Sequence, residues 1–175
     1  MIRINNKAVL YIICSIVCGA TVSYGNVFAE DVTYEVDVAT GINITIPTNT
    51  VTLNLTPTNV ASFKSSDLPV TVKTNNPTGY TLTMSPSDDT TTSLTRTGGT
   101  ETIPTLADLS GGYTEQTFTT NKWGYKLSAT NYLPFATSNE IAVTDAPSNA
   151  TISTVTFATK ADTTLVSGAY NLEIT

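Results

Sequence analysis

The chain contains no histidine, only two cysteines and few charged residues among its 175 positions. Charged side chains make up 13% of the chain, about half of the ~25% that is usual in soluble domains. Eight lysines and arginines oppose fourteen acidic residues, which gives a net charge of −6. This acidic balance excludes a nucleic-acid binder, because such proteins need a basic surface. The lack of histidine excludes any reaction that depends on an imidazole group.

The N-terminal residues have the pattern of a secretory signal peptide. Two basic residues precede an uncharged, mostly apolar stretch, residues 8–22. The more polar stretch that follows ends with Val27 and Ala29, which place small residues where signal peptidase requires them. We therefore expect residues 1–29 to be removed after Ala29, and the protein to be secreted and held at the cell surface.

A membrane anchor and a lipidated cysteine are the alternative interpretations of this N-terminal run. A spanning helix needs about 20 apolar residues, and the uncharged run is shorter. A lipidated cysteine normally follows a small residue, whereas Cys14 follows isoleucine and Cys18 follows valine. Both cysteines leave with the signal peptide. The exported chain, residues 30–175, then has no disulfide and no good ligand for zinc, and we expect no membrane span in it.

Neutral polar residues dominate the exported chain. Threonine, serine and asparagine occupy 58 of its 146 positions, and threonine alone occupies 35. Threonine suits the exposed face of a strand, but a disordered, threonine-rich stalk has a similar composition. Periodicity decides against the stalk. Eight segments alternate apolar and polar residues, as half-buried strands do: 32–38, 42–46, 51–55, 70–73, 80–84, 123–127, 154–157 and 170–174.

Turn-forming residues separate these segments. All eight prolines lie between the segments or at their ends, as expected of residues that lack the N–H of a strand ladder. Residues 75–79 have the composition of a hairpin turn, and the Gly-Gly pairs at 98–99 and 111–112 mark two more turns. We therefore predict an all-β fold in one domain, residues 30–175, arranged as a single antiparallel β-sandwich of the immunoglobulin-like type.

The only tryptophan lies in the most distinctive local motif, Trp123-Gly124-Tyr125. Trp123 and Tyr125 could form an aromatic platform that binds a glycan or a cell-wall polymer by stacking. The alternative is that both residues fill the core, with Gly124 allowing another backbone to approach closely. Alternation favours the core, because it places Trp123, Tyr125 and Leu127 on one apolar face.

Asp88 and Asp89 form an acidic pair that is a candidate calcium site. Calcium takes several oxygen ligands, but this loop lacks the spaced carboxylates of an EF-hand, so we expect a solvated loop tip without metal. No serine lies in a G-x-S-x-G motif and no two carboxylates stand out for glycoside hydrolysis. We therefore predict a protein that is not an enzyme and has no cofactor. Lys–Asn isopeptide crosslinks are conceivable, but the sequence does not pair their partners.

Four stretches occur in an order that resembles a known group of proteins. They read TNNPTGYTLTM (74–84), TIPTL (102–106), NKWGYKL (121–127) and SGAY (167–170). The order resembles uncharacterised secreted, threonine-rich β-sandwich surface proteins of Gram-positive and candidate-phylum bacteria, over most of residues 32–175. That group has no established activity, so the resemblance implies a fold and a surface location only.

A more distant similarity is to the WxL cell-wall-binding domain, which implies a WxL-like sandwich and peptidoglycan binding. In that domain too, a Gly-aromatic-Thr-Leu-Thr strand comes early and a Gly-x-Tyr strand comes near the end. The match departs at Tyr125, where the WxL signature has leucine, and no Trp-x-Leu follows Tyr170.

These features predict a secreted, non-enzymatic cell-surface protein with an envelope-structural or adhesive role. A glycan- or peptidoglycan-binding module with Trp123 and Tyr125 in its site is the first alternative. A pilus-like subunit that assembles with other surface subunits by strand exchange is the second. The last alternating segment ends one residue before Thr175. We expect either a truncated chain or a protein that is released or held non-covalently at the surface. An exposed or incomplete last strand could also accept a strand from a partner.

Overall fold

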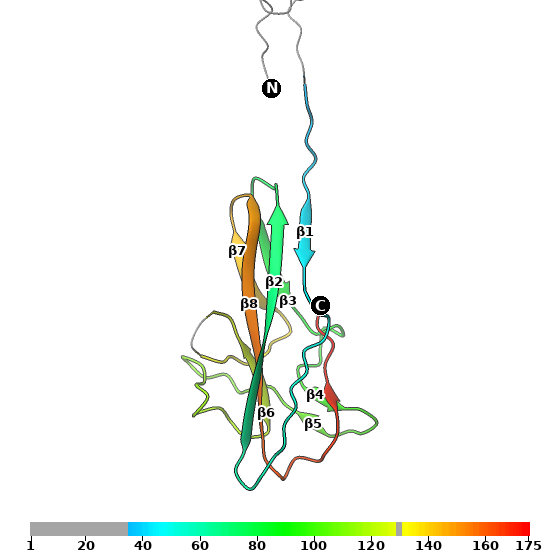
Figure 1. Ribbon diagram of the computed structural model, residues 1–175, viewed down its shortest axis with the longest axis vertical. Coiled ribbons are helices and arrows are strands. Elements are labelled where there is room, and N and C mark those ends of the chain that lie inside the picture. Colours follow the sequence, from blue (N-terminus) through cyan, green and yellow to red (C-terminus); the bar gives the residue numbers. More distant parts are fainter. Residues whose placement is uncertain (1–34, 129–130) are drawn as a thin grey trace, which may run out of the picture. The chain divides into compact units, whose positions relative to one another are not determined.

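A computed structural model describes residues 35–128 and 131–175 of the chain (Figure 1). The predicted signal peptide, with its cleavage site at Ala29, lies outside these residues. The chain divides into one unit that ends at Ala39 and a second unit, Thr40–Thr175. In the first unit no strand forms over residues 35–38. The strand predicted at 32–38 is therefore wrong over its described part.

The unit Thr40–Thr175 contains nine strands and, in its described residues, no helix. They form a four-stranded sheet in the order β1-β2-β8-β6, which we call the main sheet, a β3-β7 pair and a three-stranded sheet β5-β4-β9, and all strand pairs are antiparallel. The all-β, antiparallel prediction is confirmed. The strands are β1 (Ile42–Thr45), β2 (Ser62–Thr74), β3 (Tyr80–Met84), β4 (Leu94–Arg96), β5 (Thr102–Ile103), β6 (Lys122–Lys126), β7 (Asn139–Thr144), β8 (Ser148–Ala161) and β9 (Tyr170–Asn171).

None of the described residues belongs to a helix with the length and apolar character needed to cross a membrane.

The long strands β2 and β8 run side by side through the main sheet (Figure 1). Val70 and Val72 are buried on one face, as their alternation predicts. Pro69, by contrast, lies inside β2, where the sequence predicted a strand end. β1 pairs only with the last four residues of β2, starting at Thr71. At Pro69, β2 therefore has a neighbour on one side only, and such an edge position tolerates a missing N–H.

The turn at residues 75–79 forms as predicted, but it does not close a hairpin. Gly79 has φ 70° and donates its N–H to the carbonyl oxygen of Asn76 at 3.0 Å. β2 and β3, which flank this turn, belong to different sheets. The connection from β7 to β8 also passes between these two sheets. The hairpin prediction is therefore wrong, and two arches carry the chain between the main sheet and the β3-β7 pair.

The part of the main sheet that contains β6 is covered on both faces. Trp123 and Tyr125 alternate along β6 with Gly124, which opposes Ala158, so the two sets point to opposite faces. Two buried clusters follow this division. The first contains Met84, Ile103, Trp123, Tyr125, Phe135 and Val155. The second contains Leu106, Tyr113, Phe118, Tyr132 and Ala158, with Phe63 packed against it.

Three predicted strands differ from the structure in detail. Residues 51–55 alternate half-buried and exposed side chains but form no strand. The strand predicted at 170–174 is reduced to β9, Tyr170–Asn171, and a single bridge joins Ile174 to Pro86. β1 forms where the pattern predicts it, but all four of its residues are exposed rather than half-buried.

Candidate functional site

The two aromatic residues of the predicted glycan platform lie in the core. Trp123 is 3% exposed and Tyr125 is 5% exposed. The Trp123 ring packs against Phe135, with 5.0 Å between ring centroids, and its indole N–H donates to the carbonyl oxygen of Thr92 at 3.0 Å. Burial raises the pKa of the Tyr125 phenol. A stacking platform needs an exposed ring face, so this burial supports the core interpretation of both residues.

Gly124 lies where Leu106 of the second cluster and the backbone of Leu133 approach β6. A Cβ atom at this position would lie 2.6 Å from Leu106 Cδ1 and 2.6 Å from the carbonyl oxygen of Leu133. Leu133 also pairs with Tyr125 through an isolated antiparallel bridge. Only glycine allows this approach without a shift of the Leu133 backbone, which agrees with the role the sequence suggested for it.

The Asp88-Asp89 loop is a turn held by its own hydrogen bonds. The Asp88 carboxylate accepts the backbone N–H groups of Thr90 at 3.0 Å and Thr91 at 2.8 Å. Hydrogen bonds from the Thr91 side chain, the Thr91 backbone and the Thr90 backbone lower the pKa of Asp88 to about 2. Over residues 35–128 and 131–175, no three acidic, cysteine or histidine side chains gather as a metal site would require.

We expect acid to weaken the fold partly through Asp88. Its pKa is about 2 in the folded chain against 3.8 for a free aspartate, so the stabilising contribution is complete above about pH 4 and is lost as the pH falls towards about 2. The urea midpoint is expected to fall over this range, and to fall less in Asp88→Asn. Identical acid profiles for the two proteins would contradict this assignment. The pKa values of Glu101 and Asp162 are also lowered, so part of the fall remains in the variant.

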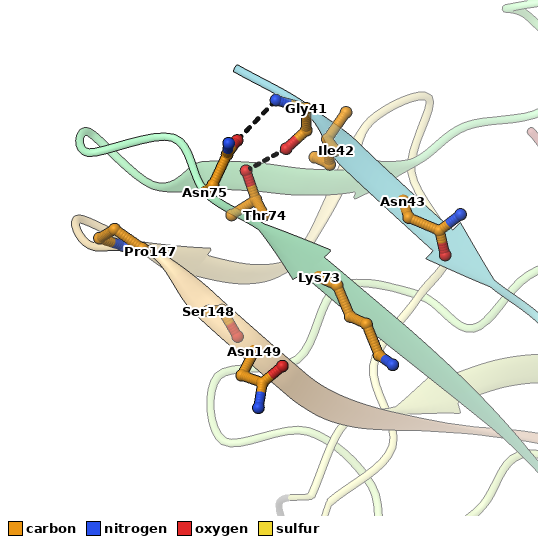
Figure 2. A pocket seen from close by; sticks show the side chains of 9 residues that line it. All are labelled: Gly41, Ile42, Asn43, Lys73, Thr74, Asn75, Pro147, Ser148 and Asn149. Atoms are coloured by element: carbon orange, nitrogen blue, oxygen red, sulfur yellow. Dashed lines mark hydrogen bonds between the residues drawn. The ribbon is translucent and has the colours of Figure 1, made fainter. Parts of the chain in front are cut away.

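A shallow depression of about 640 Å³ lies where β1 and β8 start and β2 ends (Figure 2). Three hydrogen bonds fix the start of β1 here. The Gly41 N–H donates to Asn75 Oδ1 at 2.6 Å, the Asn75 N–H donates to the Gly41 carbonyl at 3.3 Å, and Thr74 Oγ1 donates to the same carbonyl at 2.9 Å. The depression is lined by Gly41, Ile42, Asn43, Lys73, Thr74, Asn75, Pro147, Ser148 and Asn149.

The isoleucines of β1 are exposed although they lie on the inner face of the main sheet. Ile42 opposes Thr74 and Ile44 opposes Val72, so both share the face of Val72, which is 1% exposed. Yet Ile42 is 58% exposed and Ile44 is 50% exposed. We call Ile42, Ile44 and Ile46, which follows the same alternation, the isoleucine face. Exposed apolar side chains in a row are typical of an interaction surface.

The main sheet has four strands, whereas the β3-β7 pair has two. No third strand of the described chain joins the β3-β7 pair. A recess of about 230 Å³ lies between the start of β1 and the start of β3. Its lining includes Ile42 and Tyr80. The Tyr80 hydroxyl is buried and has no hydrogen-bond partner in the described structure.

Nothing in the sequence pattern alone marks this place as a site. The alternation of residues 42–46 was detected, but it was interpreted as a half-buried strand, because a pattern does not show whether a facing strand exists. The sequence predicts an open strand edge near the C-terminus. In the structure, residues 173–175 are paired with residues 85–87, and among the described strands β3 pairs on one edge only, with β7.

Comparison with known proteins gives no relative for this chain. No protein-family model matches it. No curated protein and no solved structure matches it either. The resemblance to threonine-rich surface proteins and to the WxL domain therefore stays a prediction.

Proposed function

We propose that this chain is a secreted, non-enzymatic, structural or adhesive subunit of the cell surface that associates with other proteins through the isoleucine face. We infer further that its facing sheets form a β-sandwich that is open at the β1 end. The observation that carries the proposal is the exposure of Ile42 and Ile44 on a face that is buried elsewhere in the same sheet. Apolar rows beside an unpaired strand edge are where β-proteins add further strands.

The composition of the chain supports this proposal. The signal-like N-terminus directs export, and the chain is rich in neutral threonine and poor in charge. A wall polymer or glycan remains a proposed partner, but Trp123 and Tyr125 are too deeply buried to provide its stacking platform.

Cell fractionation tests the surface role. The full-length chain is expressed in a bacterial host, and its N-terminus is determined after the cytosol, the envelope and the medium have been separated. We expect a protein that starts at Glu30 and is found in the envelope fraction or the medium. A chain that stays in the cytosol with residues 1–29 intact would contradict export and with it the proposed function.

A further inference from the structure

The free edge of β3 continues a strand ladder that has already begun. Just beyond β3, Ser85 and Thr175 exchange two backbone hydrogen bonds of 2.8 and 2.9 Å, and Ser87 donates to the Glu173 carbonyl at 2.9 Å. A strand that continued this ladder would lie beside β3, from Met84 to Tyr80. We call the edge of β3 that faces away from β7 the acceptor edge. No described strand pairs with it.

The acceptor edge requires an alternating strand. Ser85 and Ser87 direct their backbone groups towards the C-terminal segment, so Thr83 and Thr81 direct theirs the same way along the acceptor edge. The side chains of Tyr80, Leu82 and Met84 are buried or half-buried, whereas those of Thr81 and Thr83 are exposed. An occupant must therefore have apolar residues at every second position, which would also cover the isoleucine face.

We propose that residues 34–38 of a second copy of this chain occupy the acceptor edge. Tyr34, Val36 and Val38 alternate with Glu35 and Asp37, so the segment has one apolar face of the required period and length. In the described part, Val36 is 55% exposed and Val38 is 76% exposed, and no strand includes them. This inference rests on the proposed association through the isoleucine face and names the partner.

The antiparallel register follows from the side chains on the two strands. Val36 opposes Leu82 and Val38 opposes Tyr80, so that both valine side chains point inwards. Glu35 and Asp37 then point outwards, level with the exposed side chains of Thr83 and Thr81, where water solvates their charges.

The short tether makes it difficult for the segment to fill its own acceptor edge. Gly41 is fixed to β2 by its hydrogen bonds with Asn75 and Thr74. Only two residues separate Gly41 from Val38. Three Cα–Cα steps reach at most about 11 Å, and facing sheets already stand ~10 Å apart, so no length remains for the reversal of direction. Short connections of this kind favour exchange between copies.

The geometry also makes the exchange reciprocal. A donor segment that ran parallel to β3 would have to connect to its own β1 past Thr175, where the ladder is already occupied, whereas in an antiparallel donor only the chain N-terminal to the segment extends that way. An antiparallel donor leaves beside Tyr80, at the end of the domain where Gly41 lies and where the recess between β1 and β3 opens. Each copy thus presents its segment and its acceptor edge at the same end. This arrangement gives a closed, two-fold dimer rather than a filament.

The molar mass of the exported protein tests this proposal. We expect sedimentation equilibrium to give twice the chain mass for the wild type and the single-chain mass for Val36→Asp, which places a charge on the inner face. Glu35→Gln, at the adjacent outward position, is the matched control and is expected to stay dimeric. Circular dichroism shows whether each variant is folded. A deletion of residues 30–38 gives the same test without a new charge.

The outcomes separate the two proposals. A wild-type protein that is exported and monomeric would overturn the strand exchange and leave the proposed surface role intact. A dimer that persists in both Val36→Asp and the deletion would also overturn it, because its interface would lie elsewhere.

Discussion

Trp123→Ala is expected to lower the free energy of unfolding by about 3–5 kcal/mol. The Trp123 ring is 3% exposed and packs against Phe135 and Phe157. Its removal leaves a cavity in the first cluster and leaves the Thr92 carbonyl without its donor. Because small domains are stable by only about 5–15 kcal/mol, the variant loses a large part of its stability.

Urea unfolding followed by circular dichroism measures this loss, and Trp123→Phe is the control because it keeps an aromatic ring in the cluster. We expect the control to lose less stability than the alanine variant. The result also separates the two interpretations of this residue. A glycan platform predicts nearly unchanged stability in Trp123→Ala together with lost binding to cell-wall polymers, and that combination would contradict the core assignment.

Gly79→Ala is expected to cost about 3 kcal/mol or more, because strain and a steric clash act together. Gly79 has φ 70°. A Cβ atom here would overlap the carbonyl oxygen of Thr144 and lie 2.5 Å from its carbonyl carbon. The two arches touch at this point, so the substitution must push them apart, and backbone atoms cannot rotate away as a side chain can.

Gly98 provides a matched control for this prediction. It has φ 73°, and a Cβ atom there would have no neighbour within 4 Å. Gly98→Ala therefore imposes the same unfavourable φ without the clash, at a cost of about 1 kcal/mol. The difference between the two urea midpoints measures the contact between the arches. Equal losses in the two variants would show that the arches do not meet as the structure has them.

The local sequence pattern predicted where strands and turns form better than it predicted which strands pair with each other. The turn at Gly79 followed from composition, because residues that accept positive φ are few. Its flanking strands were assigned to one hairpin, since nothing in residues 70–84 shows that β3 pairs with the distant β7. The position of Pro69 was missed for a related reason, because it depends on where β1 stops along β2.

The burial of a side chain could be predicted from the sequence only in strands whose residues alternate between a buried and an exposed face. Alternation predicted that Trp123 and Tyr125 lie in the core, and both belong to the first buried cluster of the structure. It did not predict the second cluster, because Leu106, Phe118 and Tyr132 come from loops that have no periodic pattern. The exposure of Ile42 could not be predicted either, because the alternation of residues 42–46 does not show whether another part of the chain covers them.

Disulfide trapping between two copies is the most direct test of strand exchange at the acceptor edge. Residues 30–175 contain no cysteine, so in a protein made from these residues engineered thiols are the only ones present. In the proposed register Glu35 of one copy lies opposite Thr83 of the other, at the ~5.5 Å Cα separation that a disulfide accepts. Glu35→Cys and Thr83→Cys are made in separate chains, mixed, unfolded, refolded together and mildly oxidised.

The account predicts a covalent heterodimer on a non-reducing gel, and none when Thr163→Cys, at an exposed position, replaces Thr83→Cys. A heterodimer that forms equally with both partners, or with neither, would contradict the exchange. A crosslink that forms only within one chain carrying both Glu35→Cys and Thr83→Cys would show that each copy fills its own acceptor edge.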